Sequence, residues 1–436
     1  MQPYTHLIPF NNRGILYLNG SMKCVLLTTD EVHSFTEKLD IPVLSDLLRE
    51  NERMYRQQNE LQLGAVGLTL NVANTCNLCC SYCYANGGNY HGKDALMSAD
   101  LASSAVRFFA KQYGNLKRIK FFGGEPFLNP EAIRAACETC VTLVREGRLR
   151  DMPDFTTVTN GSILTQKLID LINQYDIGVT VSYDGDPIMQ DTLRPYLSGL
   201  GSNDSVLKNV QRLQTATGGK QPSSVEVTYT QIHVKKGVSV AQCYDNVLRL
   251  LKISDVKITP VSCSDEDIHF LKSIETFQKA IQSGYSQNPI NRRVVEKAYR
   301  LYQVLTHRKR SNRIFCGAGI NRFSVSADGR VYPCYLFTND DAFCLGNLLD
   351  GSCSLTDYEP ERQKLMEYDR LSANECGDCW ASSFCFGCRG NNHRLSGNPD
   401  VPSADFCQML KEITENLLCC MADAGDIEEL DHEVLD

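Results

Sequence analysis

Strand and helix patterns alternate along the middle of this 436-residue chain, from Val66 to about Ser283. Six short segments rich in valine, isoleucine, threonine and phenylalanine have the composition of buried strands. They are residues 66–73, 118–122, 155–159, 177–181, 224–228 and 256–260. Helical patterns separate them, for example at residues 99–112, 131–145 and 164–174. Strands joined through helices run parallel, so we predict an α/β fold with a parallel sheet.

The composition is that of a soluble globular protein, with 42% hydrophobic and 22% charged residues. The length allows about three domains. The first residues contain no basic segment followed by an apolar one, and no apolar run reaches membrane-spanning length. We therefore expect a cytoplasmic protein without a membrane partner. The net charge of -8 disfavours non-specific binding to nucleic acid, which requires a basic surface.

A cysteine-rich loop follows the first predicted strand. Cys76, Cys80 and Cys83 have the spacing C-x3-C-x2-C, and Tyr82 directly precedes the last of them. Three thiolates from one short loop can hold three irons of a cubane cluster and leave the fourth iron open to a substrate or cofactor. A structural zinc site or a group of buried thiols would also place three cysteines together. Cys79 lies outside the spacing and is expected to be a bystander.

Polar residues and glycines follow the predicted strands, where barrel-like α/β folds bind their ligands. The second strand runs into Gly123-Gly124-Glu125-Pro126. Glycines let the backbone approach a ligand closely, and a carboxylate can accept hydrogen bonds from an ammonium group. Asn160 follows the third strand, and Ser182 and Asp184 follow the fourth. The planar guanidinium of Arg194 could pair with a carboxylate of a ligand.

A second group of cysteines follows a helical stretch at residues 291–310. Its members are Cys316, Cys334, Cys376, Cys379, Cys385, Cys388 and Cys407. A hairpin-like turn at residues 326–333 precedes Cys334, and two C-x2-C pairs lie further on. Such a pair places both thiolates on one metal centre, so this region alone would also fit a zinc ribbon. Twenty cysteines in a chain without an export signal favour metal or cluster ligation over disulfides.

The cysteine loop and Gly123 to Pro126 together resemble the radical S-adenosylmethionine (SAM) enzymes. The resemblance implies a partial (β/α)6 TIM-type barrel in which a 4Fe-4S cluster on Cys76, Cys80 and Cys83 cleaves SAM to a 5'-deoxyadenosyl radical. The glycine-rich motif would hold the SAM amino group, and Ser182 is the candidate for the ribose. The residues implied to bind SAM, or for Arg194 either SAM or substrate, are Tyr82, Gly123, Gly124, Glu125, Pro126, Asn160, Ser182, Asp184 and Arg194.

The second cysteine group resembles the SPASM domain, which carries two auxiliary 4Fe-4S clusters in addition to the radical SAM cluster. The resemblance implies a distal cluster on Cys376, Cys379, Cys385 and Cys407, and a proximal cluster on Cys316, Cys334 and Cys388. Two residues separate Cys385 from Cys388 where the family usually has three. The fourth proximal ligand stays open between Cys344, a substrate thiolate and a vacant iron.

The first 65 residues have their own pattern of strands at 5–10, 14–19 and 23–29, followed by helices at 31–39 and 43–58. This order resembles the winged-helix-like recognition element of maturases that modify ribosomally synthesised peptides, and a structural appendage is the alternative. Such elements bind a leader peptide, often by adding a strand to a sheet edge. We predict a recognition domain at 1–65, the barrel at 66–288, a helical linker at 289–311 and the SPASM domain at 312–436.

Taken together, the motifs resemble the thioether-forming radical SAM/SPASM maturases, a class that includes the sactipeptide and ranthipeptide enzymes and the freyrasin maturase. The resemblance implies a cysteine-containing precursor with a leader, and an electron donor such as flavodoxin or ferredoxin. A carbon–carbon bond-forming cyclase, an anaerobic sulfatase-maturing enzyme and a zinc-binding scaffold are the alternatives. Sulfatase-maturing enzymes usually begin close to their cysteine loop and carry aspartate where Tyr335 stands, whereas 75 residues precede Cys76 here.

Overall fold

The computed structural model describes residues 4–39, 42–56, 66–287, 295–308, 316–353 and 376–430. The chain divides into two compact units. The first comprises Met1–Gln62, Ser273–Cys316 and Glu367–Asp436, and the second comprises Leu63–Lys272 and Gly317–Met366. Parts of two predicted helices, at residues 57–58, 291–294 and 309–310, lie outside the described residues. Among the described helices, none is long and apolar enough to cross a membrane.

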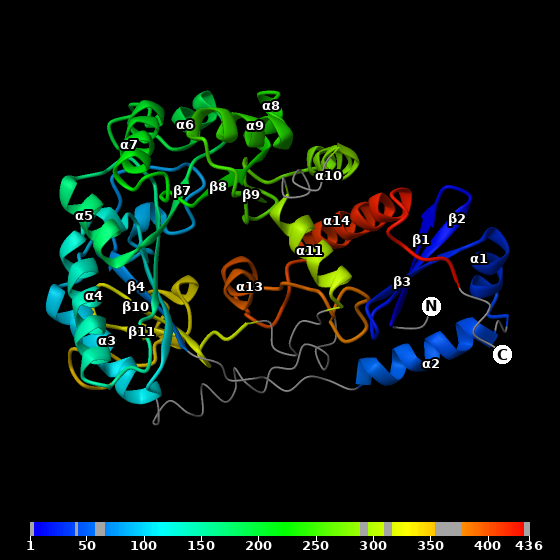
Figure 1. Ribbon diagram of the computed structural model, residues 1–436, viewed down its shortest axis with the longest axis horizontal. Helices are drawn as coiled ribbons and strands as arrows, with labels where there is room; N and C mark the ends of the chain where they lie inside the picture. The colour runs from blue at the N-terminus through cyan, green and yellow to red at the C-terminus, as the bar shows by residue number, and fades with distance from the viewer. Residues whose placement is uncertain are drawn as a thin grey trace. The chain divides into compact units, whose positions relative to one another are not determined.

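An eight-stranded sheet forms the centre of the second unit, in the order β11-β10-β4-β5-β6-β7-β8-β9 (Figure 1). Its strands are β4 (Val66–Ala73), β5 (Leu116–Gly123), β6 (Asp154–Thr159), β7 (Gly178–Ser182), β8 (Ser224–Tyr229), β9 (Val256–Pro260), β10 (Arg322–Val325) and β11 (Val331–Tyr332). Strands β4 to β9 pair in parallel, each with the next in sequence. The predicted α/β fold with a parallel sheet is confirmed.

Helices connect these strands and lie along one side of the sheet. They are α3 (Ala99–Tyr113), α4 (Pro130–Arg145), α5 (Gln166–Tyr175), α6 (Pro187–Leu193), α7 (Asn203–Ala216), α8 (Gln231–Lys235) and α9 (Val240–Leu251). Helix α3 illustrates how the sequence sets their limits. The Ser98 hydroxyl accepts the Leu101 N–H at 3.1 Å, and Gly114 ends the helix with a left-handed φ of 64°. Ala102, Ala105 and Phe109 recur on one face and are buried there.

The hairpin of β10 and β11 extends the sheet beyond the six strands of the barrel. The predicted turn before Cys334 is present, since β10 and β11 pair antiparallel across it. Strand β10 also pairs in parallel with β4, from Arg322 opposite Gly67 to Val325 opposite Leu70. The first strand of an open barrel would otherwise present unpaired N–H and C=O groups along its edge, and β10 satisfies them.

A smaller antiparallel sheet in the order β1-β2-β3 lies in the first unit. Its elements are β1 (Thr5–Phe10), β2 (Arg13–Leu18), β3 (Lys23–Leu27), α1 (Thr29–Thr36) and α2 (Pro42–Arg56). The same unit contains α10 (Glu275–Gln287), α11 (Glu296–Thr306), α13 (Arg389–Ser396) and α14 (Ala404–Asp423). Three strands followed by two helices match the order predicted for this segment.

Both faces of the small sheet are buried. Leucines and a valine on one face pack with Leu44 of α2. On the other face, the Tyr17 ring lies edge-on to Trp380 and Phe384, with ring centroids 5.8 and 5.6 Å away. The Asn19 amide donates to Ser382 Oγ at 2.8 Å. The N-terminal sheet is therefore packed directly on the loop that contains Cys376, Cys379 and Cys385.

Candidate functional site

The loop after β4 brings the first three predicted ligands to the carboxyl end of the sheet. The three are Cys76, Cys80 and Cys83, and all are half-buried. The loop is held by the segment that follows α6, because the Cys79 N–H donates to Pro195 O at 2.8 Å and the Ser81 N–H to Leu193 O at 2.9 Å. The Cys79 side chain is exposed. The thiols of Cys76, Cys80 and Cys83 are thus held on a loop that the backbone hydrogen bonds fix, whereas the Cys79 thiol faces solvent.

The sulfur of Cys76 receives hydrogen bonds from the protein. Leu78 N–H lies 3.4 Å and Asn160 Nδ2 3.6 Å from Cys76 Sγ. Burial raises the pKa of Cys76 to about 12 and that of Cys80 to about 11. Since iron binds the thiolate, assembly of a cluster on this loop would release protons. Donors placed on a sulfur stabilise the charge that a bound cluster would leave on it.

Gly123 and Gly124 let two stretches of backbone approach each other closely. The Gly124 N–H donates to Ala73 O at 2.7 Å, and the Glu125 N–H donates to Thr75 O at 2.9 Å. A Cβ at Gly123 would lie 2.2 Å from Ala73 O, and one at Gly124 would lie 2.1 Å from Thr75 O. Gly123 also has a φ of 125°. Only glycine fits at these two positions, and the motif is therefore bound to the cysteine loop.

The Glu125 carboxylate is fully buried and is held by three donors. Its Oε1 accepts from the Thr159 hydroxyl at 2.7 Å and from the Phe127 N–H at 2.9 Å. Its Oε2 accepts the Asn160 N–H at 2.7 Å. Burial raises the pKa of this carboxyl above its usual value, and the three hydrogen bonds oppose that rise. Because each carboxylate oxygen has two lone pairs, Oε2 retains capacity for an ammonium donor.

Tyr82, Asp184 and Arg194 form a buried network beside the cysteine loop. The Tyr82 hydroxyl donates to Asp184, with both carboxylate oxygens at 2.8 Å, and Arg194 Nη1 donates to the Tyr82 oxygen at 2.8 Å. Burial raises the pKa of the Asp184 carboxyl, whereas the Arg194 charge lowers it. Arg194 Nε is buried and has no hydrogen-bond partner among the described residues. A buried, unsatisfied guanidinium N–H fits the carboxylate of a bound ligand such as SAM.

We predict that Arg194→Lys weakens SAM binding by about tenfold to 100-fold, because a lysine cannot present both the Nη1 and Nε donors. Isothermal titration of reconstituted protein with SAM measures this. Arg118→Lys is the matched control, since that arginine is exposed and forms an ion pair with Asp154 at 3.6 Å. Equal SAM affinity in both variants would show that Arg194 does not take part in SAM binding.

Sequence reasoning missed a second brace on the cysteine loop. The Ser81 hydroxyl lies 2.9 Å from His269 Nε2, and His269 Nδ1 lies 2.7 Å from Asp267 Oδ1. The Asn77 amide donates to Ser162 Oγ at 2.8 Å on the other flank. These partners lie far apart in sequence, and only the Asp267-x-His269 spacing hinted at a local pair. Ser182, predicted for the ribose, ends β7 and is half-buried.

Four cysteines of the second group line one cavity in the first unit. They are Cys376, Cys379, Cys385 and Cys407, the four that were predicted to hold the distal cluster. The cavity has a volume of about 250 Å³. Zinc–sulfur bonds of about 2.3 Å would draw four thiolates around one point, so a cavity of this size fits a cluster better than one ion. Among the described residues, no three His, Cys, Asp or Glu side chains converge on a single metal position.

The predicted proximal ligands are divided between the two units. Cys316 and Cys388 belong to the first, and Cys334 belongs to the second. Burial raises the pKa of Cys388, and the nearby Cys316 thiol adds to that rise. Cys344, the open candidate for a fourth ligand, donates its thiol to Gly346 O at 3.6 Å.

Comparison with protein families finds two matches. Residues 70–231 match the Radical SAM superfamily, and residues 316–380 match SPASM, an iron–sulfur cluster-binding domain. The first segment contains the cysteine loop, the glycine motif and Arg194. The chain therefore combines a radical SAM domain with an iron–sulfur cluster-binding domain, and it is an enzyme that uses SAM and iron–sulfur clusters.

Individual proteins are similar over most of the chain. The radical SAM cyclopropyl synthase TigE of Paramaledivibacter caminithermalis is 22% identical over 435 residues, which cover 94% of this chain and 81% of TigE. The structure of native anSMEcpe with bound AdoMet has a TM-score of 0.64 at 21% identity and covers 83% of this chain and 99% of that one. Streptococcus suis SuiB bound to the precursor peptide SuiA has a TM-score of 0.51 at 14% identity, over 94% and 99%. These structures share the fold.

Proposed function

We propose that this chain is a peptide maturase that forms thioether crosslinks between cysteine sulfur and carbon in a ribosomally synthesised precursor. The observation that supports a peptide substrate is the fold shared with Streptococcus suis SuiB, which is seen bound to the precursor peptide SuiA and covers 94% of this chain. The sheet of β1 to β3 lies outside both segments that match family models and is the proposed recognition element for the peptide.

The described residues would hold SAM and the cluster as follows. Cys76, Cys80 and Cys83 would ligate three irons, and the fourth iron would bind SAM; the bound pair supplies a 5'-deoxyadenosyl radical. The Glu125 motif would accept the amino group of SAM, and Arg194 would donate to its carboxylate. Tyr82, held by Asp184, keeps Arg194 in place. The protein thereby positions the reactive carbon of SAM against one C–H bond of the peptide.

The second cysteine region would serve the sulfur side of the reaction. Thioether formation removes two hydrogens from the peptide in total, so two electrons must leave the substrate. One is accounted for when the deoxyadenosyl radical takes a hydrogen atom from carbon. The other would pass to an auxiliary cluster while the thiol proton is released to solvent, and a flavodoxin or ferredoxin would supply the electron that starts SAM cleavage. A substrate thiolate is one of three candidates for the fourth position of the proximal cluster, beside Cys344 and a vacant iron.

We predict that Cys407→Ala removes the distal cluster and lowers the iron content by about four atoms per chain. Cys407 lies near the start of α14 and lines the cavity. Cys419→Ala is the control, because that cysteine is also half-buried on α14 but does not line the cavity. Iron and sulfide analysis of anaerobically reconstituted proteins decides between them. Equal loss in both variants, or in neither, would contradict a cluster in this cavity.

The reaction is tested by incubating reconstituted protein with SAM, reductant and a cysteine-rich candidate precursor under anaerobic conditions. High-resolution mass spectrometry after thiol alkylation is the readout. A thioether removes two hydrogens and one alkylatable thiol for each link. Loss of hydrogen with every thiol still alkylatable would instead favour carbon–carbon bond formation. 5'-Deoxyadenosine without any peptide change would show that the precursor is not the substrate.

A carbon–carbon bond-forming cyclase is the second candidate, favoured by the alignment with the cyclopropyl synthase TigE over 94% of the chain. Sulfatase maturation also fits the combination of domains. Tyr335 stands at the position where those enzymes usually carry aspartate, and the centroid of its ring lies 4.6 Å from that of Phe122. Lys120 Nζ lies over both rings, at 4.2 and 5.4 Å from their centroids. A Tyr335→Asp variant that gained sulfatase-maturing activity would identify this position as the determinant.

A further inference from the structure

The outer edge of the small sheet is occupied by another part of the same chain. In the sheet order β1-β2-β3, strand β3 has β2 on one side only. On its other side, Leu26 pairs in parallel with Glu429. The Leu26 N–H donates to Glu428 O at 2.9 Å, and the Leu430 N–H donates to Leu26 O at 3.4 Å. Residues 426–430, which we call the edge segment, thus lie beside β3 and are joined to it by one β-bridge.

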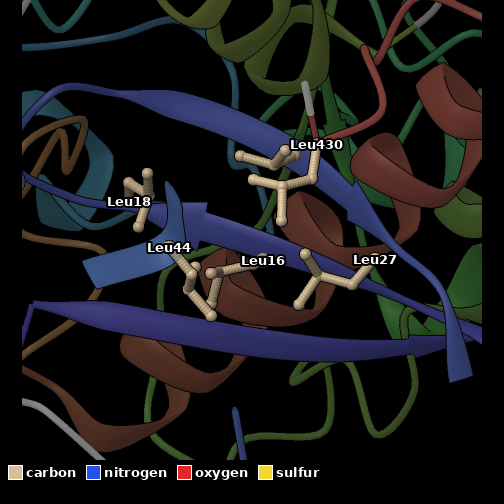
Figure 2. Packing of buried hydrophobic residues seen from close by; sticks show 6 residues of the cluster. Leu16, Leu18, Leu27, Leu44 and Leu430 are labelled. Atoms are coloured by element: carbon tan, nitrogen blue, oxygen red, sulfur yellow. The ribbon is translucent and has the colours of Figure 1, made fainter. Parts of the chain in front are cut away.

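Side chains fix the edge segment in this register. Leu430 is 6% exposed and packs with the leucines of β2, β3 and α2, as Figure 2 shows. Ile427 is buried to the same degree, whereas Glu428 and Glu429 face solvent. The Glu429 carboxylate accepts a hydrogen bond from Arg13 Nη2 at 2.7 Å. Two buried apolar side chains, Ile427 and Leu430, flank two exposed glutamates, and one ion pair and one leucine pocket fix the segment at this edge.

A short turn delivers the edge segment from α14. Gly425 follows the helix with a left-handed φ of 77°, and the Asp426 N–H donates to Met421 O at 2.8 Å. The Asp426 carboxylate also accepts the Tyr285 hydroxyl. Because the segment is covalently attached to a helix that packs in the same unit, its local concentration at β3 is high.

Only one strand at a time can use the outward backbone groups of Leu26 and the pocket that Leu430 fills. The Thr28 N–H, next in line on that edge, is already taken by the Glu31 carboxylate at 2.7 Å in the capping box of α1. We propose that the edge segment is a built-in competitor of the precursor peptide, whose leader must displace it in order to pair with β3. This inference rests on the proposed function, because it presumes that the chain binds a peptide.

The edge segment also defines the class of peptide that the edge accepts. A competing leader needs an extended stretch with an acidic residue placed to meet Arg13, followed directly by a leucine or similar apolar residue for the pocket. Such a leader must displace an attached competitor, so its observed affinity equals its intrinsic affinity multiplied by the fraction of molecules in which the edge is open. Opening the edge should therefore strengthen binding.

The test uses a fluorescent synthetic peptide with the sequence of residues 425–430, Gly-Asp-Ile-Glu-Glu-Leu, and measures anisotropy with the reconstituted full chain. We expect Leu430→Asp, and a chain that ends at Gly425, to bind this peptide at least about tenfold more tightly than the unchanged chain. Glu428→Gln, which alters an exposed side chain of the same segment, should bind like the unchanged chain. A peptide carrying aspartate in place of its leucine should bind none of them.

Equal affinity of the fluorescent peptide for the unchanged and opened chains, or binding to neither, would overturn the proposal. Iron content and melting temperature check that each opened chain is folded, and the shortened chain keeps the test valid if Leu430→Asp is not. The precursor used for the mass measurement should displace the fluorescent peptide. If the precursor is crosslinked but does not displace the peptide, the proposed competition at β3 is contradicted, whereas the proposed function is not. Displacement of the fluorescent peptide without any change in precursor mass would support competition at the edge of β3 and would count against thioether formation.

Discussion

Cys80→Ala is expected to abolish SAM cleavage, lowering the rate of 5'-deoxyadenosine formation by at least about 100-fold. Loss of a residue that only supports a metal ligand already costs tenfold to 100-fold, and loss of a ligand itself costs more. Cys80 is half-buried and lies on the loop braced by Pro195 and Leu193. The measurement is chromatographic assay of 5'-deoxyadenosine under anaerobic conditions with dithionite, together with iron analysis.

Cys79→Ala provides a control within the same loop. The Cys79 side chain is exposed, and only its backbone N–H takes part in the bracing of the loop. Replacement by alanine keeps that hydrogen bond, so iron content and the cleavage rate should match the unchanged protein. If Cys79→Ala were as damaging as Cys80→Ala, the assignment of ligands by C-x3-C-x2-C spacing would be wrong.

Gly124→Ala is expected to have the second largest effect, although it adds only one methyl group. Its Cβ would lie 2.1 Å from Thr75 O and 2.9 Å from Gly88 Cα, which are backbone atoms and cannot move away as a side chain would. Relief requires separation of the glycine motif from the start of the cysteine loop. We expect loss of about 1–3 kcal/mol in the free energy of unfolding and weaker SAM binding. Thermal unfolding and SAM titration measure the two effects.

Gly67→Ala is the matched control for that substitution. Gly67 lies on β4, one strand from the motif, and a Cβ there would meet only the Arg322 side chain, at an ordinary 3.8 Å. Alanine should be tolerated, with unchanged SAM affinity. Equal SAM affinity of Gly124→Ala and Gly67→Ala would show that the close approach of the two backbones does not shape the SAM site.

Regular elements were predictable from the sequence where local pattern decides them. Residues 5–10, 66–73 and 256–260 have the bounds predicted for them, because each is a short apolar run between turn residues. The pairing of β10 with β4 was not predicted. Strand β10 has only four residues, and its partner lies about 250 residues earlier, so its place depends on the free edge of β4 and not on its own composition.

The site shows the same division. Spacing alone singled out the cysteine loop, and the two adjacent glycines marked the close backbone approach that the structure contains. The network of Tyr82, Asp184 and Arg194 joins residues up to 112 positions apart, so a single sequence gives their type but not their hydrogen bonds. The pairing of Leu26 with Glu429 could not be foreseen either, since an isolated Glu-Leu beyond the turn that ends a helix has no strand pattern.

The central claim is tested most directly by measuring whether hydrogen from the peptide appears in the 5'-deoxyadenosine formed from SAM. A candidate precursor with fully deuterated non-exchangeable positions is incubated with the reconstituted protein, SAM and reductant, and the 5'-deoxyadenosine is analysed by mass spectrometry. We predict that 5'-deoxyadenosine gains one deuterium for each crosslink formed, because the radical takes its hydrogen from a peptide carbon. Crosslinked peptide accompanied by deuterium-free 5'-deoxyadenosine would contradict a mechanism in which this chain generates a SAM-derived radical to attack the peptide.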